Sequence, residues 1–350
     1  MIPTHRPRHT AFRIARVLFL IAVMALAGAL FLPADRPASA ADGEPMNPLE
    51  RPEYVELLKL LETEHGFAPE QLEAWFGKVT LHEKIPQIFD RPAEAKPYHE
   101  YRLLFTGPRI HTLGADYLLE NADLLTRVEE RTGVPPTVVA AIMGIETKFG
   151  SVKGGYHAFD ALNSAFALYP QRRAFFQKEL VEFLLLCREE QTDPFDFDGS
   201  YAGALGMPQF MPSSFRAFAV DFDGDGKRNI WTSHADVAGS IGNYLAQHGW
   251  RRGEPLKAEV FLTPEQAARF NGGPKQKIPL AELTAAGIQA PEFARVGGDA
   301  QVAVVSYQEA DGRERFFVVF DNFLAIMRYN TSVNYAMVAA ELDDFFRGAA

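Results

Sequence analysis

The 350-residue sequence contains one cysteine and three tryptophans. A single cysteine cannot form an internal disulfide, which excludes a fold stapled by disulfides. Cys187 lies in an apolar, helical stretch, so we expect a buried and unreactive thiol. The nine histidines lack the HExxH spacing that brings two zinc ligands onto one face of a helix. We therefore do not expect zinc-dependent catalysis.

Positive charge is also scarce, because 35 lysines and arginines stand against 45 aspartates and glutamates. The formal net charge of -10 argues against a protein that binds phosphate backbones, and we predict no nucleic-acid partner. Aromatic residues make up 12% of the chain and offer flat apolar faces to neutral sugar rings. The length suits two or three packed subdomains.

The only long hydrophobic run covers residues 17–32. It follows a positive segment and precedes the small residues Ala38, Ser39 and Ala40, which is the order of a secretory signal peptide cut after Ala40. An uncut membrane anchor is the alternative, since the run approaches spanning length. The positive segment contains Arg6, Arg8, Arg13 and Arg16.

Helical patterns dominate the remainder and predict an α+β fold that is predominantly α. After the signal at 1–40 and a flexible lead at 41–51, we expect a helical domain at 52–130 and a core at 131–252. A small β subdomain at 253–325 contains strand-like runs at 300–307 and 315–320, and a C-terminal segment covers 326–350. The predicted helices span 54–65, 69–76, 114–131, 135–149, 172–191, 237–248 and 332–346.

One carboxylate falls on the apolar face of the helix predicted at 135–149. Val139, Ile142, Met143 and Glu146 share this face by i+3 and i+4 spacing. Desolvation there raises the pKa of the carboxyl, as a general acid near neutral pH requires. A glutamate at a helix end that pairs with Lys148 is the alternative.

A glycine-rich loop at 199–212 contains three glycines and two prolines. Glycines allow a backbone to approach a ligand closely. The amide of Gln209 can both donate and accept hydrogen bonds, which suits an acetamido group, and Phe210 and Met211 offer apolar contact. Ser213 is a plausible N-cap for the following helix. Taken alone, the pattern fits a structural turn equally well.

A second loop begins with the D-x-D-x-D-G pattern of an EF-hand, and its aspartates are Asp221, Asp223 and Asp225. Lys227 would offer its carbonyl at position seven. Position twelve, where an EF-hand has glutamate, is Thr232, and the nearest later carboxylate is Asp236. We predict a structural Ca²⁺ site, because three close aspartates repel one another without a cation. A plain solvated turn is the alternative.

Three segments together resemble the membrane-bound lytic transglycosylase B family over about residues 52–346. They are residues 144–150 (GIETKFG), 169–170 (YP) and 199–214 (GSYAGALGMPQFMPSS). The resemblance implies a lysozyme-like catalytic core with a helical N-terminal domain and a small β domain. It also implies cleavage of the MurNAc–GlcNAc bond of peptidoglycan glycan strands, and an extended calcium loop closed by an aspartate.

By motif, the resemblance assigns the catalytic role to Glu146 and polar substrate contacts to Ser200 and Gln209. It places Arg172 on the peptide or lactyl side, although Gln171 here intervenes between the proline and the arginines. The groove residues that it implies are Tyr101, Tyr244, Tyr329, Asn330 and Tyr335. Family members are often lipid-anchored, but this chain lacks the necessary cysteine. We expect a periplasmic monomer, with cell-wall enzyme complexes as further partners.

The resemblance implies one catalytic carboxylate and formation of a 1,6-anhydro ring without water. A goose-type lysozyme that uses water is the first alternative, and its base would come from Asp160, Asp193, Asp196 or Asp198. The second alternative is a non-catalytic peptidoglycan-binding protein.

Overall fold

The structure is a computed structural model that describes residues 48–152 and 154–349. The predicted signal at 1–40 and most of the lead lie outside the described residues. Across these two ranges, fifteen α-helices and six short strands confirm the predominantly helical α+β class. Within the described ranges, no helix combines the length and the apolar character needed to cross a bilayer.

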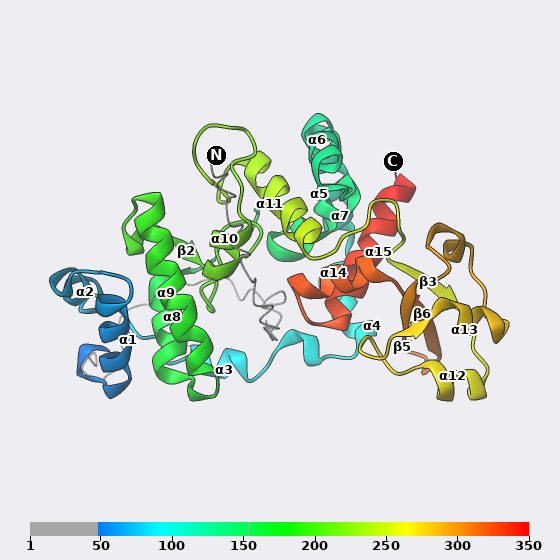
Figure 1. Ribbon diagram of the computed structural model, residues 1–350, viewed down its shortest axis with the longest axis horizontal. Helices are drawn as coiled ribbons and strands as arrows, with labels where there is room; N and C mark the ends of the chain where they lie inside the picture. The colour runs from blue at the N-terminus through cyan, green and yellow to red at the C-terminus, as the bar shows by residue number, and fades with distance from the viewer. Residues whose placement is uncertain (1–47, 153, 350) are drawn as a thin grey trace, which may run out of the picture.

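At one end of the molecule, the N-terminal helices pack against a pair of later helices (Figure 1). The edge of the Tyr54 ring meets Phe166 at 5.1 Å, and Phe76 meets Phe159 at 5.2 Å. Such edge-to-face pairs add to the apolar burial that joins distant segments. The helices here are α1 (Pro52–Thr63), α2 (Pro69–Phe76), α3 (Ile85–Phe89), α8 (Ala158–Leu168), α9 (Arg173–Glu190) and α10 (Pro212–Phe218).

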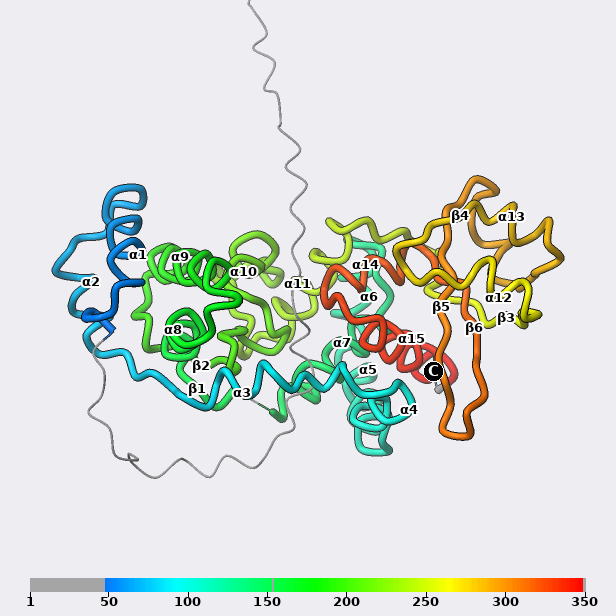
Figure 2. The backbone as a smooth tube through the Cα atoms, turned by 90° about the horizontal axis from the view of Figure 1, so that it is seen from below, coloured from blue at the N-terminus to red at the C-terminus, as the bar shows by residue number. Residues whose placement is uncertain are grey.

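Helix α7 (Pro136–Thr147) is the centre of the second group, and residues 138–145 are all buried. It packs most extensively against the C-terminal helix and against the two helices that precede α7 in the chain. Figure 2 shows this group between the α8 and α9 end and the sheet. Its other helices are α4 (Tyr98–Tyr101), α5 (Pro108–Glu120), α6 (Ala122–Thr132), α11 (His234–Gln247), α14 (Asp321–Tyr329) and α15 (Val333–Ala349).

Helix α7 ends at Thr147, two residues before the predicted end. Lys148 and Phe149 take left-handed backbone angles, with φ of 49° and 58°, and the N–H of Phe149 donates to the carbonyl of Met143 at 3.2 Å. This turn folds the Phe149 ring back toward Gly144. Glu146 consequently lies in the last turn of the helix.

Two other helical predictions differ from the structure. The helix expected at 114–131 is divided at Asn121, whose side-chain N–H donates to the Tyr117 carbonyl at 2.9 Å. This bond satisfies an orphan carbonyl at the helix end and competes with continuation of the helix. Helix α14 was not predicted.

The sheet has the strand order β3-β6-β5-β4, with antiparallel pairing throughout. Val302 and Val304 of β5 face a small separate core, whereas Ala303 and Val305 face the main core. The alternation of side chains along a strand therefore lets one sheet cover two cores. The strands are β3 (Lys257–Val260), β4 (Ile278–Pro279), β5 (Gln301–Gln308) and β6 (Glu314–Val319), and α12 (Pro264–Phe270) and α13 (Leu280–Ala285) belong to the small core.

Strands β5 and β6 confirm the two predicted strands, with the Asp311–Gly312 turn between them. The residues of the small core all lie between 258 and 320. A second, two-stranded sheet pairs β1 (Tyr156–His157) with β2 (Asp198–Gly199) and leads into the glycine-rich loop.

The glycine-rich loop approaches the backbone of another segment closely at Gly206. This residue has a φ of +62°, and a Cβ there would lie 2.6 Å from the carbonyl oxygen of Ile230. A side chain would therefore meet backbone that cannot rotate away. The N–H of Met207 also donates to that carbonyl at 2.9 Å, which fixes the loop against the segment before α11.

We predict that Gly206→Ala destabilises the protein more than Gly287→Ala does. Gly287 also has a positive φ, of +80°, but no atom lies within 4 Å of the place that a Cβ would take there. Both substitutions cost about 1–2 kcal/mol for the left-handed backbone, and Gly206→Ala adds about 1–3 kcal/mol of overpacking. Thermal melting of the two variants measures the difference. Equal losses would show that the loop relaxes away from Ile230.

Candidate active site

Glu146 lies where four distant segments meet at the end of α7. The hydroxyl of Tyr335, at the start of α15, donates a hydrogen bond of 2.7 Å to Glu146 Oε1. Tyr335 is fully buried, and its ring is nearly parallel to that of Tyr329 with the centroids 6.5 Å apart. The buried hydroxyl therefore has a fixed direction toward the carboxyl, which it orients.

Burial raises the pKa of Glu146 to about 8 and is the largest influence on it. The hydrogen bond from Tyr335 acts in the opposite direction, because it stabilises the carboxylate, and the charge of Glu94 raises the pKa further. Glu146 therefore holds a proton at neutral pH. A proton held at neutral pH is the property that a general acid requires.

A pocket opens beside this carboxyl. It brings together seven residues that the sequence singled out with one that it did not. Glu146 is the only carboxylic acid among the described residues of the lining. The lining consists of Glu146, Gln209, Phe210, Met211, Ser214, Tyr244, Tyr329 and Asn330.

The aromatic lining residues are packed into the wall. Phe210 is buried between Tyr244 and Tyr329, with ring centroids at 5.6 and 5.7 Å. The hydroxyl of Tyr244 donates to the Arg328 carbonyl at 2.5 Å, and that of Tyr329 donates to the Pro208 carbonyl at 2.6 Å. Because their hydroxyls are engaged with backbone, these rings present mainly apolar surface. Asn330 Oδ1 accepts a bond of 2.9 Å from the N–H of Ser332.

Gln209 has a left-handed backbone, with φ of 51°, at the edge of the pocket. Its side-chain N–H donates to the Gly206 carbonyl at 2.8 Å, which fixes the amide plane. Strained backbone of this kind is maintained by its surroundings and is frequent at functional sites. The amide oxygen has no protein hydrogen bond in the described part of the chain and is available to a ligand.

Besides Tyr335, three residues implied by the resemblance lie outside the pocket lining. Ser200 Oγ accepts from the N–H groups of Ala202 and Ala204, so it closes the turn of the glycine-rich loop. The guanidinium of Arg172 lies 4.2 Å from the centroid of the Phe175 ring. Tyr101 is fully buried, which raises its pKa, and the negative charges of Glu94 and Glu146 raise that pKa further.

Ser214 lines the pocket but was not proposed as a site residue. It belongs to the same QFMPSS segment as Gln209 and lies one helical turn after Met211, which was the available signal. The expectation that Ser213 caps α10 is wrong. Met211 occupies the N-cap position, and both the N–H and the hydroxyl of Ser213 donate to Glu179, at 2.9 and 2.7 Å.

The EF-hand-like loop lies between α10 and α11. Carboxylate oxygens of Asp221, Asp223 and Asp236 all lie within 4.8 Å of one another. Asp236 is buried, and its two oxygens accept from the N–H groups of Phe222 and Asn229. Burial raises the pKa of Asp236, and the charges of the other two aspartates raise it further. Such crowding of oxygen donors suits a hard cation.

The other two predicted ligands are the carboxylate of Asp225 and the backbone carbonyl of Lys227. The carboxylate of Asp225 accepts from the N–H of Lys227 at 2.8 Å and does not belong to the close group of three. Thr232, at position twelve, accepts through its hydroxyl from the side chain of Asn229 at 2.6 Å. The loop is thus closed by Asp236, which also sits in the first turn of α11.

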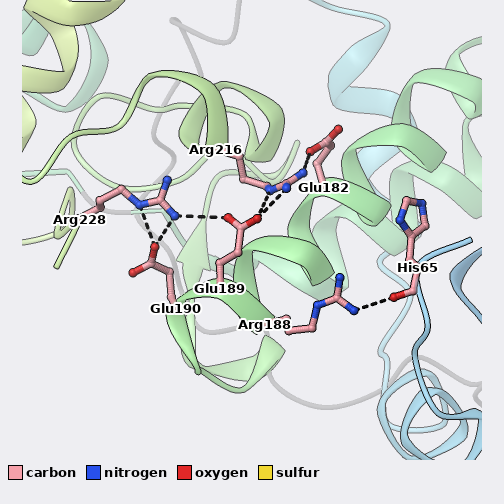
Figure 3. Close-up of polar contacts among 7 residues, drawn as sticks. All are labelled: His65, Glu182, Arg188, Glu189, Glu190, Arg216 and Arg228. Atoms are coloured by element: carbon pink, nitrogen blue, oxygen red, sulfur yellow. Dashed lines mark hydrogen bonds and ion pairs between the residues drawn. The ribbon is translucent and has the colours of Figure 1, made fainter. Parts of the chain in front are cut away.

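An ion-pair network ties this region to α9 (Figure 3). Arg216 of α10 pairs with Glu182 and, at 2.6 Å, with Glu189. Arg228, which follows the aspartate-rich segment, pairs with Glu190 at 2.5 Å and with Glu189 at 3.4 Å. The Arg216 hydrogen bond lowers the pKa of Glu189. The network therefore anchors both the EF-hand-like loop and α10, the helix that follows Gln209, to α9.

A family model of the transglycosylase SLT domain matches residues 50–344. Membrane-bound lytic murein transglycosylase B of Escherichia coli K12 is 33% identical over 301 residues, which cover 83% of this chain and 81% of the relative. The fold and the sequence likeness define a peptidoglycan-degrading lytic transglycosylase with a lysozyme-like fold. The chain belongs to the transglycosylase SLT domain family.

Solved structures agree with this assignment. Soluble lytic transglycosylase SltB1 of Pseudomonas aeruginosa is 40% identical with a TM-score of 0.79, covering 85% of this chain and 99% of that one. Lytic transglycosylase Slt35 of Escherichia coli in complex with calcium is 32% identical with a TM-score of 0.77, covering 85% and 93%. SltB3 of Pseudomonas aeruginosa in complex with NAG-NAM-pentapeptide is 28% identical with a TM-score of 0.74, covering 85% and 79%.

We predict that Tyr335→Phe raises the pKa of Glu146, because it removes the hydrogen bond that stabilises the carboxylate. The titration of the Glu146 side-chain carboxyl, followed by carbon-13 NMR, measures this change. Tyr329→Phe is the matched control, since its hydroxyl donates to the Pro208 carbonyl. A Glu146 pKa that is unchanged or lowered in Tyr335→Phe would contradict the orientation assigned to this bond.

Proposed function

We propose that the protein cleaves the β-1,4 bond between MurNAc and GlcNAc without water and leaves 1,6-anhydro-MurNAc ends. The observation that carries the proposal is the single protonated carboxyl, Glu146, in a pocket with apolar aromatic walls. Most glycosidases need two carboxylates, one of which activates water or attacks the sugar. A mechanism that returns the proton to the same carboxyl needs only one.

In the proposed reaction, Glu146 gives its proton to the bridging oxygen as the bond from C1 to that oxygen breaks. The GlcNAc portion leaves with the resulting hydroxyl. The neighbouring N-acetyl group, held by Gln209, stabilises the positive charge that develops at C1. The Glu146 carboxylate then takes the proton of the C6 hydroxyl, and that oxygen bonds to C1. The proton count balances, and the carboxyl is ready for another cycle.

Two features support intramolecular attack over hydrolysis. None of the four aspartates considered as a hydrolytic base lines the pocket. Asp160 accepts from the N–H of Thr80, Asp193 caps a short 3-10 helix, and Asp198 lies 3.6 Å from His157 at the surface. Apolar walls also give a water molecule few partners, whereas a sugar hydroxyl is held by its own ring.

The substrate class follows from the family and from the relative SltB3, which is described with a NAG-NAM-pentapeptide. We propose that glycan strands of peptidoglycan occupy the pocket. Because the relative from Escherichia coli is named membrane-bound, we propose a site of action in the periplasm, either free or tethered by an uncut signal.

We predict that Glu146→Gln folds normally and loses turnover by about 10²–10⁴-fold, the usual contribution of general acid–base catalysis. Mass spectrometry of muropeptides released from purified peptidoglycan measures both rate and product. The wild type should yield products that are lighter by one water and resist borohydride reduction. Normal turnover by the variant would remove Glu146 from its role, and reducible, hydrated ends would make the enzyme a hydrolase.

We also propose that the loop with Asp221, Asp223 and Asp236 binds a structural Ca²⁺. The close group of three carboxylates supports this proposal, as does the mutual repulsion that adds to burial in raising the pKa of Asp236. A relative is described in complex with calcium. The cation would offset this repulsion and hold together the two ends of the loop between α10 and α11.

We predict that Ca²⁺ raises the melting temperature of protein first treated with a chelator, and that Mg²⁺ does so less, because it prefers octahedral geometry and retains its waters. At a concentration 100 times the Kd, linkage gives about 2.7 kcal/mol of stabilisation. Asp223→Asn should reduce the shift. Asp311→Asn, in the exposed β5–β6 turn, should leave it intact. A calcium shift that is equal in both variants would place the cation elsewhere.

A further inference from the structure

A second carboxyl group lies near the active site and has no part in the proposed reaction. Glu94 belongs to a 3-10 helix, Ala93–Ala95, in the segment between α3 and α4. This segment crosses from the α8 and α9 end of the molecule toward the sheet (Figure 2). One carboxyl oxygen of Glu94, Oε1, is buried without a hydrogen-bond partner in the described part of the chain. An unsatisfied buried oxygen is costly and calls for an explanation.

The backbone around Glu94 is fixed to the same helix that orients Glu146. The side-chain N–H of Asn334 donates to the Glu94 carbonyl at 3.3 Å and to the Lys96 carbonyl at 3.1 Å. Asn334 precedes Tyr335, whose hydroxyl donates to Glu146. The start of α15 therefore holds the two glutamates in a fixed relation through adjacent residues.

The groups around the two carboxyls are tyrosine hydroxyls, which do not offset the repulsion between two carboxylate charges. They are the hydroxyls of Tyr101 from α4, Tyr201 from the glycine-rich loop, Tyr329 from α14 and Tyr335 from α15. In addition to burial, the charge of Glu94 raises the pKa of Tyr101, Tyr201 and Glu146. Among the described residues, no lysine or arginine contributes to the pKa of either glutamate.

We propose that Glu94 is a positioning residue for the general acid, a buried carboxylate held within electrostatic reach of Glu146 so that Glu146 retains its proton. This inference rests on the proposed role of Glu146. Like charges in a poorly solvated site disfavour each other, so ionisation of one group delays ionisation of the other. The two carboxyls titrate as a coupled pair.

The order of ionisation fixes the direction of the effect. Burial raises the pKa of Glu94 to about 7, whereas that of Glu146 is about 8. As the pH rises, Glu94 loses its proton first, and its charge then holds the proton on Glu146 to a higher pH. Without Glu94, Glu146 ionises earlier, and the acid form is lost at a lower pH.

We expect Glu94→Gln to lower the Glu146 pKa by at least about half a pH unit. The alkaline limb of the pH–rate profile should move to lower pH by the same amount, so that the rate at a given pH on that limb falls about threefold. Turnover at pH values where both groups are protonated should be unchanged. The amide has nearly the same shape as the carboxyl and no charge, so the fold should be retained. Carbon-13 NMR of the glutamate carboxyls gives the Glu146 pKa without reference to activity.

Two further variants complete the experiment. Glu94→Asp restores a carboxylate, and its Glu146 pKa should return toward that of the wild type. Glu100→Gln removes an exposed glutamate on α4, which pairs with Lys96 at 3.8 Å, and should change neither readout.

An unchanged Glu146 titration in Glu94→Gln would overturn the inference, and so would an equal fall in rate at all pH values. Neither result would affect the proposed reaction, which fails only if Glu146→Gln remains active or if the products are hydrated. The two proposals are therefore tested separately.

Discussion

The candidate active site depends on one constraint, which is that a carboxyl group lies in the last turn of a buried helix. Helix α7 supplies the burial, because its residues from 138 to 145 are enclosed by neighbouring helices. The left-handed turn at Lys148 and Phe149 ends the helix just after Glu146. The position of the helix end therefore sets both the pKa and the access.

The C-terminal helix completes the site that α7 begins. Tyr329 at the end of α14 forms part of the pocket wall, and Tyr335 at the start of α15 orients Glu146. The sheet precedes these residues in the chain, and its inner face belongs to the main core through Val305 and Val319. The β subdomain thus brings the chain back to α7. Its inner face belongs to the same hydrophobic core as Tyr329 and Tyr335.

The sequence predicted those features of the site that depend on residues close to one another in the chain. The apolar spacing of α7 made Glu146 a candidate, and the glycine-rich loop made Gln209 one, because periodicity and glycine content report the nearby backbone. The resemblance then assigned their roles. The hydrogen bond from Tyr335 joins residues 189 positions apart, and only the resemblance suggested that the two are near. Strands β3 and β4 escaped prediction because runs of two to four residues carry no clear period. Glu94 lies among prolines and charged residues, a composition typical of an exposed loop.

The proposed exclusion of water has its physical basis in how the pocket uses its polar groups. Tyr244 and Tyr329 direct their hydroxyls to backbone carbonyls, and the Gln209 side chain is fixed by Gly206. A water molecule beside C1 would need several hydrogen-bond partners, and these walls already use most of theirs on the protein. The C6 hydroxyl belongs to the same sugar residue as C1, so its attack is intramolecular and needs no separately bound nucleophile. The same satisfied hydrogen bonds that stabilise the wall therefore favour ring closure over hydrolysis.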